Sequence, residues 1–179
     1  MKILLALPLM LTLTARGGET KGDAKKDDKT VAKPGDAKPG DVKPADAPKA
    51  GGPLDLPKLG LKGDAPAESN AGDAIGGGVG HMVQGPGGFV ATVEVASDTR
   101  PKTAEDAKKE ADMYTPKNLK DEKLADGWAI TFDNEGGLGK NYFVNVRRDI
   151  DGKSIWCETT SSTPEQQASV LAFCKSLKK

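Results

Sequence analysis

The sequence predicts an α+β domain in which an antiparallel sheet of about five strands packs against two helices. Four segments alternate apolar and polar residues, which is the period of a half-buried strand. Two further segments, which begin at Thr103 and Thr163, repeat apolar residues every three or four positions, as helices do. All eight aromatic residues lie between Phe89 and Phe173, so we expect the core there. The alternating segments are residues 89–95, 128–132, 142–146 and 155–159.

Residues 1–15, MKILLALPLMLTLTA, have the pattern of a bacterial export signal, because Lys2 precedes an apolar stretch that ends in small residues. About thirteen residues that rise about 1.5 Å each cover about 20 Å, which is too short for a hydrocarbon core of about 30 Å. Leu13-Thr14-Ala15 resembles a lipobox, but Arg16 stands where a lipoprotein carries its lipid-accepting cysteine. We therefore expect export to the periplasm or cell envelope without lipidation. Contact with a membrane is expected only through the signal, or through the lipid anchor of relatives.

Residues 17–53 contain eight lysines, seven acidic residues and no aromatic residue. A near-repeat, AKPGD-AKPGD-VKPAD, runs from Ala32 to Asp46. This composition offers too little apolar surface to offset chain entropy, which predicts a disordered linker. Its root-mean-square span is about 30–36 Å. The folded domain is then residues 54–179, whose 16 basic and 19 acidic residues give no basic footprint for a nucleic acid.

The domain begins with a glycine-rich stretch that holds two weak strand candidates, residues 59–61 and 82–83, before the clear strand at 89–95. Thr103 and Asp106 form a capping-box-like pattern that opens the first helix. Pro116 ends that helix, because proline lacks the backbone N–H that a helix requires. One face of this helix carries Ala104, Ala107, Ala111 and Tyr114.

Asp151-Gly152, between two alternating segments, predicts a two-residue hairpin turn. With these two residues as the loop, Ile150 faces Lys153 across the hairpin. The same register places Val146 opposite Cys157 and Arg147 opposite Trp156.

The last helix is predicted from Thr163, Pro164 and Gln166, which occupy the N-cap, N1 and N3 positions of a capping box. Val170, Cys174 and Leu177 line one face of this helix. A helix packed on the strand face that carries Cys157 brings Cys157 and Cys174 together. Because exported chains with two cysteines most often bond them, we predict a disulfide. It closes a loop of about 18 residues and contributes about 3 kcal/mol.

The order of elements is strands, helix, at least three antiparallel strands and a closing helix that includes residues 172–177, AFCKSL. This order resembles the α+β sandwich of the PsbP-like and DcrB-like envelope proteins, many of which are lipoproteins. The resemblance covers about residues 55–179. It implies an accessory or binding module rather than an enzyme.

Few residues suggest a cofactor or metal. His81 is the only histidine and follows a glycine-rich stretch, residues 76–80, that lacks the Lys-Ser/Thr of a phosphate loop. We expect a flexible turn there, and expect His81→Ala to preserve fold and function. Asp149, Asp151 and Glu158 match part of a calcium loop, but its first position falls on a cation, Arg147. A hairpin turn explains the same residues, so we predict no metal and no cofactor.

Asp133 and Glu135 open the stretch DNEGGLGKN, which we interpret as a polar loop. Their carboxylates suit general acid and base chemistry, and they are the basis of an alternative function, a small periplasmic hydrolase-like enzyme. No nucleophile motif accompanies them.

A binding surface is expected on the sheet face that carries Phe143, Arg147, Trp156 and Glu158. Arg147 stacked on Trp156 forms a cation–π pair worth about 0.5–1 kcal/mol at an exposed site. The competing interpretation is that the first helix covers this face as core.

These observations predict a non-enzymatic, monomeric, exported envelope protein, an accessory or binding module on a flexible stalk. The expected partner is an envelope protein, a peptide or a glycan. A second alternative is a structural stalked protein that engages cell-wall polymer.

Overall fold

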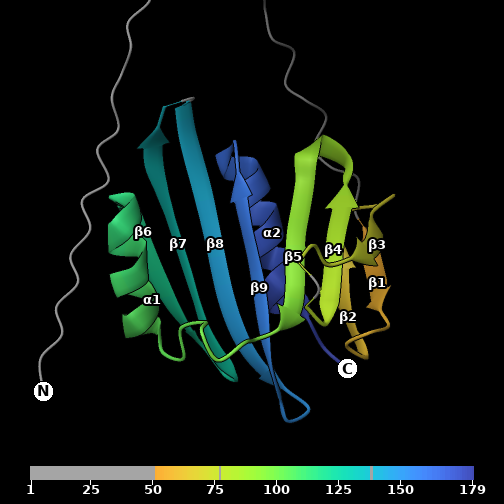
Figure 1. Cartoon of the computed structure of the whole chain (residues 1–179). Helices are drawn as coiled ribbons and strands as arrows, with labels where there is room; N and C mark the ends of the chain where they lie inside the picture. The colour runs from red at the N-terminus through yellow and green to blue at the C-terminus, as the bar shows by residue number, and fades with distance from the viewer. Residues whose placement is uncertain (1–50, 77, 138) are drawn as a thin grey trace, which may run out of the picture. The chain divides into compact units, whose positions relative to one another are not determined.

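The computed structural model describes residues 51–179 apart from Gly77 and Leu138. The predicted signal, Arg16 and the predicted linker up to residue 50 lie outside the described residues. The described part contains two sheets and two α-helices in the order that Figure 1 shows. The elements are β1 (Gly52–Leu56), β2 (Leu61–Ala65), β3 (Asn70–Asp73), β4 (Gly80–Gly85), β5 (Phe89–Val95), α1 (Ala104–Ala111), β6 (Lys117–Leu124), β7 (Gly127–Gly136), β8 (Gly139–Ile150), β9 (Lys153–Ser161) and α2 (Pro164–Ser176).

Among the described residues, seven strands form one antiparallel sheet in the order β3-β4-β5-β9-β8-β7-β6, and β1 and β2 form a second sheet. The α+β class and the two predicted helices are confirmed, whereas the prediction of about five strands is wrong. The missed strands carry few apolar residues: β6 reads KNLKDEKL and β3 reads NAGD. Both are edge strands held by backbone pairing, which leaves no alternating pattern in the sequence. β1 begins at Gly52, so its first two residues fall within the segment predicted as linker.

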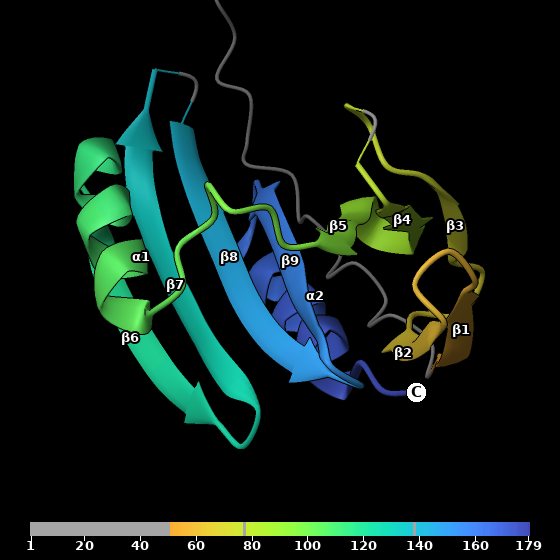
Figure 2. The ribbon, with the colours of Figure 1, turned by 60° about the horizontal axis from the view of Figure 1, so that its bottom comes forward.

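The seven-stranded sheet lies between α1 on one face and α2 on the other (Figure 2). The larger core lies on the α2 face, where β1 and β2 also pack. Its centre is Phe173, whose ring meets Phe89 edge-to-face with centroids 5.6 Å apart. A smaller core on the α1 face contains Trp128, Ile130 and Phe132. No described helix is both long and apolar enough to cross a membrane.

The hairpin of β8 and β9 has the predicted register. Ile150 pairs with Lys153, Val146 with Cys157 and Arg147 with Trp156. Asp151 and Gly152 both have positive φ, as a tight two-residue hairpin turn requires. The period-2 pattern and the turn residues together were therefore sufficient to align these strands.

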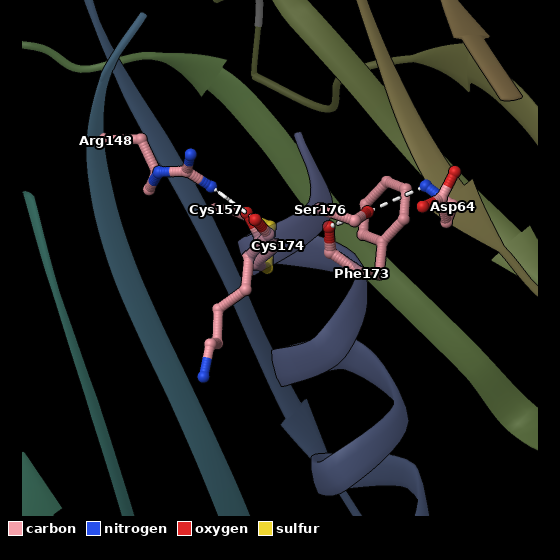
Figure 3. Close-up of a disulfide and its surroundings, with 7 residues drawn as sticks. Asp64, Arg148, Cys157, Phe173, Cys174 and Ser176 are labelled. Atoms are coloured by element: carbon pink, nitrogen blue, oxygen red, sulfur yellow. Dashed lines mark hydrogen bonds between the residues drawn. A yellow bond between two sulfur atoms is a disulfide. The ribbon is translucent and has the colours of Figure 1, made fainter. Parts of the chain in front are cut away.

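The predicted disulfide between Cys157 on β9 and Cys174 on α2 is present, with Cα atoms 5.8 Å apart (Figure 3). Both cysteines are fully buried. Hydrogen bonds fix the same helix end, because the guanidinium of Arg148 donates to the carbonyl of Lys175 at 2.6 Å. On the other side, the Ser176 hydroxyl accepts from the Asp64 backbone N–H at 2.7 Å. The end of α2 is thus joined to β9, β8 and β2.

Candidate functional site

A cleft of about 290 Å³ opens on the face of the sheet that carries α1. Its walls come from β5, β8 and β9 on one side, and from the end of α1 and the turn after it on the other. In Figure 1, α1 lies on the side of the sheet where β6 and β7 are, and no helix of the described residues covers the front of β8, β9 and β5. The cleft therefore exists because α1 covers only part of its face.

The shortness of α1 follows from its sequence. The Thr103 side chain caps the helix by accepting from the backbone N–H of Asp106 at 3.1 Å. Small residues, Ala107 and Ala111, face the sheet and allow close packing. After two turns the chain passes through a 3-10 turn and reaches Thr115 at φ 52, just before Pro116. Tyr114 is thereby left at the mouth of the cleft.

Three aromatic rings form one wall of the cleft. Phe132 and Phe143 stack with centroids 4.5 Å apart, and Tyr114 lies 5.3 Å from Phe143 and 6.1 Å from Phe132. Tyr114 is 46% exposed, so the wall continues to the protein surface.

Trp156 forms the floor and is 1% exposed. It meets Trp128 edge-to-face at 5.7 Å, and its indole N–H has no hydrogen-bond partner among the described residues. The guanidinium carbon of Arg100 lies 5.0 Å from the centroid of the Trp156 ring, within the range of a cation–π contact.

Two carboxylates hold Arg100 over Trp156. Arg100 donates to both oxygens of Glu158, at 2.6 and 3.1 Å, and to Glu94 at 3.0 Å. Burial alone would lower the pKa of Arg100, but the charge of Glu158 and the hydrogen bonds to both carboxylates raise this pKa above its ordinary value. We call Arg100, Glu94 and Glu158 the arginine clamp.

Residues 96–103, which connect β5 to α1, carry Arg100 and are tied to the sheet by backbone groups. The Ala96 N–H donates to the carbonyl of Ser154 at 2.8 Å. The Arg147 guanidinium donates to the carbonyl of Pro101 at 3.2 Å, and the Trp128 indole donates to the carbonyl of Lys102 at 3.3 Å. The connection thereby holds Arg100 in place.

Of the four residues predicted as a binding face, Phe143, Trp156 and Glu158 line the cleft and Arg147 does not. The cation over Trp156 is Arg100 rather than the predicted Arg147. Arg147 is the cross-strand neighbour of Trp156, but its side chain points to Pro101 instead. The competing interpretation also holds in part, because α1 and Trp156 share one core and Phe143 packs against it.

Arg100 and Glu94 were not predicted as site residues. The segment around Arg100 has no apolar periodicity, so nothing in the sequence places it over the sheet. The available signal was a lone arginine beside a proline, between a strand that carries Glu94 and a hairpin that carries Glu158.

Asp133 and Glu135 belong to β7 rather than to a loop, because the hairpin of β7 and β8 continues by backbone pairing to Gly136. Asp133 is buried and accepts from the Asn118 side chain at 2.8 Å. Glu135 lies 3.7 Å from the ammonium of Lys117 and is exposed. Asp133 lines a separate depression, whose lining does not include Glu135. The two carboxylates thus do not converge on one described pocket.

His81 is a structural residue, 3% exposed, at the start of β4. Its Nε2 accepts from the Lys58 backbone N–H, and its Nδ1 donates to the Gly72 carbonyl, both at 3.1 Å. Because a carbonyl can only accept, this pair of contacts specifies the neutral tautomer with the proton on Nδ1. His81 joins the turn between β1 and β2 to β3. The expectation that His81→Ala preserves the fold is at odds with these contacts.

The partial calcium pattern is accounted for by other contacts. Asp149 accepts from the Ser154 hydroxyl, and Glu158 belongs to the arginine clamp. Lys179 lies 2.8 Å from Asp151, and its hydrogen bond lowers the pKa of that carboxyl. Within the described residues, no three metal-ligating side chains form a cluster that could hold an ion.

Comparison of the chain with models of protein families and with curated proteins finds no match.

Proposed function

We propose that this protein is a non-enzymatic, exported accessory module of the cell envelope that binds a partner in the cleft beside α1. The observation that carries the proposal is an aromatic wall that runs from the buried floor to an exposed rim, next to a fixed charged group. Tyr114 and Val90, which line the cleft and are 46% and 39% exposed, form that rim. Clefts that join apolar walls to a few fixed polar groups are typical binding sites.

The arginine clamp supports a binding role because it is already ordered. Arg100 is held by three hydrogen bonds to two carboxylates and by its contact with Trp156. A partner therefore meets a site whose charged groups need little further ordering, which lowers the entropic cost of association.

Export is supported by the signal pattern of residues 1–15 and agrees with the buried disulfide, since disulfides persist in oxidising compartments. In this proposal residues 17–53 act as a tether for the domain. The order of elements also supports placing the domain with the PsbP-like and DcrB-like envelope proteins, whose members are mostly accessory or binding modules.

The binding proposal is tested by photo-crosslinking in cells that naturally make the protein. A photoreactive amino acid at Val90, an exposed residue of the cleft lining, is expected to give a discrete adduct. The same amino acid at exposed Glu165, at the start of α2 on the opposite face, is expected to give none. Thr160→Trp, which fills the cleft from an exposed position, should abolish the adduct without lowering the melting temperature. Equal adducts at the two positions, or an adduct that survives Thr160→Trp, would refute the cleft as the binding site.

Export is tested separately by joining residues 1–53 to a phosphatase that is active only outside the cytoplasm. Phosphatase activity is expected, and deletion of residues 3–13 should remove it. An inactive fusion that accumulates in the cytoplasm would overturn the export proposal.

A further inference from the structure

We infer that the cleft beside α1 selects a basic side chain, a lysine or an arginine that a partner polypeptide presents. This inference rests on the proposed binding function and specifies the chemistry of the partner.

The first support is the charge of the cleft. Its charged lining residues are Arg100, Glu110 and Glu158, and Glu94 shares the same guanidinium. Since this group holds one cation and three carboxylates, two of its negative charges have no cation within the group. The arginine clamp itself is negatively charged, because two carboxylates share one guanidinium. The carboxylate of Glu110, which is exposed, adds a further negative charge to the cleft.

The lysines of α1 do not cancel this charge, because acidic residues elsewhere engage them. Lys108 lies 2.9 Å from Asp121 on β6, and Lys109 lies 3.2 Å from Asp106 within the helix. In addition, α1 ends at the cleft, and the carbonyl groups at a helix end carry partial negative charge that favours cations.

An acidic ligand fits this cleft poorly. Arg100 is the one cation among the lining residues, and both of its terminal nitrogens already donate to carboxylates. A ligand carboxylate would have to displace Glu94 or Glu158 and would then lie beside the charge it had displaced. Like charges at such short range repel strongly where water is partly excluded.

The shape of the cleft indicates the rest of the ligand. Trp156 already carries Arg100 on its ring, so the ligand's cation is expected nearer to Glu110 and Glu158. The rings of Tyr114 and Phe143 then offer an apolar surface for the stem. An aliphatic stem that ends in a cation is the chemistry of lysine and arginine side chains, which bury their methylenes and keep the charged end near carboxylates.

The exposed rim points to a polypeptide rather than a free amine. Tyr114 and Val90 are exposed apolar residues on the two sides of the cleft. A small amine that fills the cleft of about 290 Å³ would leave this rim exposed to water. A polypeptide that inserts one side chain into the cleft would cover the rim with the residues on either side of that side chain.

The test begins with a displayed library of random heptapeptides, selected on the full-length, disulfide-bonded protein and counter-selected on Thr160→Trp. We expect the selected peptides to share one basic position. Synthetic peptides with norleucine at that position should bind about tenfold more weakly by calorimetry, because the cation loses its carboxylate partners. Butylamine should compete only at concentrations far above those of the peptide.

Glu110→Gln should weaken binding of the basic peptide about three- to fivefold, the effect of one partly exposed ion pair. The matched control Glu165→Gln, on the opposite face, should leave binding unchanged.

Peptides that bind the cleft but share an acidic or purely apolar position would overturn this inference and leave the proposed binding function intact. Butylamine that competes as well as the peptide would overturn the polypeptide partner. Failure to select any peptide that Thr160→Trp blocks would count against both proposals.

Discussion

The face of the sheet under α2 is closed by apolar packing and a covalent bond, whereas the face beside α1 is held by polar contacts and stays partly open. Among the described residues, eighteen buried residues form the core on the α2 face and six form the core on the α1 face. On the α1 face, where fewer apolar residues are buried, hydrogen bonds hold the chain to the sheet instead. Their donors are Arg100, Arg147 and Trp128. Since buried apolar area dominates stability, we expect the α2 face to stabilise the fold and the α1 face to be free for recognition.

Two phenylalanines give the most direct test of this difference. Phe173→Ala removes a fully buried ring from the α2 face and should lower the free energy of unfolding by about 3–5 kcal/mol. Phe143→Ala removes a half-buried ring from the α1 face and should cost about 1–2 kcal/mol, because part of that ring already meets water. Urea unfolding measures both losses. Equal losses would mean that the two faces contribute alike.

The disulfide is the next largest expected effect. Replacing Cys157 and Cys174 together by serine should lower stability by about 3 kcal/mol, since the crosslink no longer restricts the unfolded chain. Reduced wild-type protein should melt near the same temperature as this variant. If the double variant melts at the same temperature as the oxidised wild type, packing alone holds α2 on the sheet.

His81→Ala breaks a polar contact at the boundary of the α2 face. It leaves the Lys58 N–H and the Gly72 carbonyl unpaired in a part-buried site, which should cost about 1–3 kcal/mol. Thermal melting measures the loss, with Gln84→Ala as an exposed control on the same strand. An unchanged melting temperature would show that water replaces the imidazole at no cost.

The smallest expected effect concerns Asp126, which pairs with Arg148 beside the end of α2. The hydrogen bond from Arg148 lowers the pKa of Asp126 in the folded protein. Because the folded pKa lies below the unfolded value of about 3.9, the stabilisation is complete above that value and is lost as pH falls through the folded pKa.

Asp126→Asn should therefore cost about 0.5–1 kcal/mol at neutral pH and progressively less in acid. Urea unfolding at several pH values measures this difference, with exposed Asp98→Asn as the control. A cost that stays constant down to pH 2 would show that the carboxylate charge is not its source.

The sequence was most informative where local rules and burial agree. The alternation around Val146 and Cys157, with the Asp151-Gly152 turn, predicted the register of β8 and β9. That register, together with the apolar face of α2, then predicted the disulfide. The charged strand β6 was missed because its stability comes from backbone pairing with β7, which leaves no mark on side-chain polarity.

The candidate cleft was only partly predictable for a different reason. Phe143, Trp156 and Glu158 follow from strand periodicity, so their shared face was visible in the sequence. Arg100 reaches that face through a connection without periodicity, anchored by carbonyl groups of Pro101 and Lys102. Such backbone contacts depend on the path of the chain in space and not on residue type, which is why the wrong arginine was predicted over Trp156.

The position of β9 in the sheet constrains when the protein can fold. β9 follows all the other described strands in the chain, yet it lies between β5 and β8 and joins the two halves of the sheet. The bridge between Lys62 and Lys178 likewise joins segments that are far apart in the sequence. Pairings between such distant segments form slowly and late, so a growing chain carries two half-sheets with unpaired edges. Pairing of the two half-sheets is thereby delayed until β9 has been made, which leaves the edges of β5 and β8 open to aggregation until then.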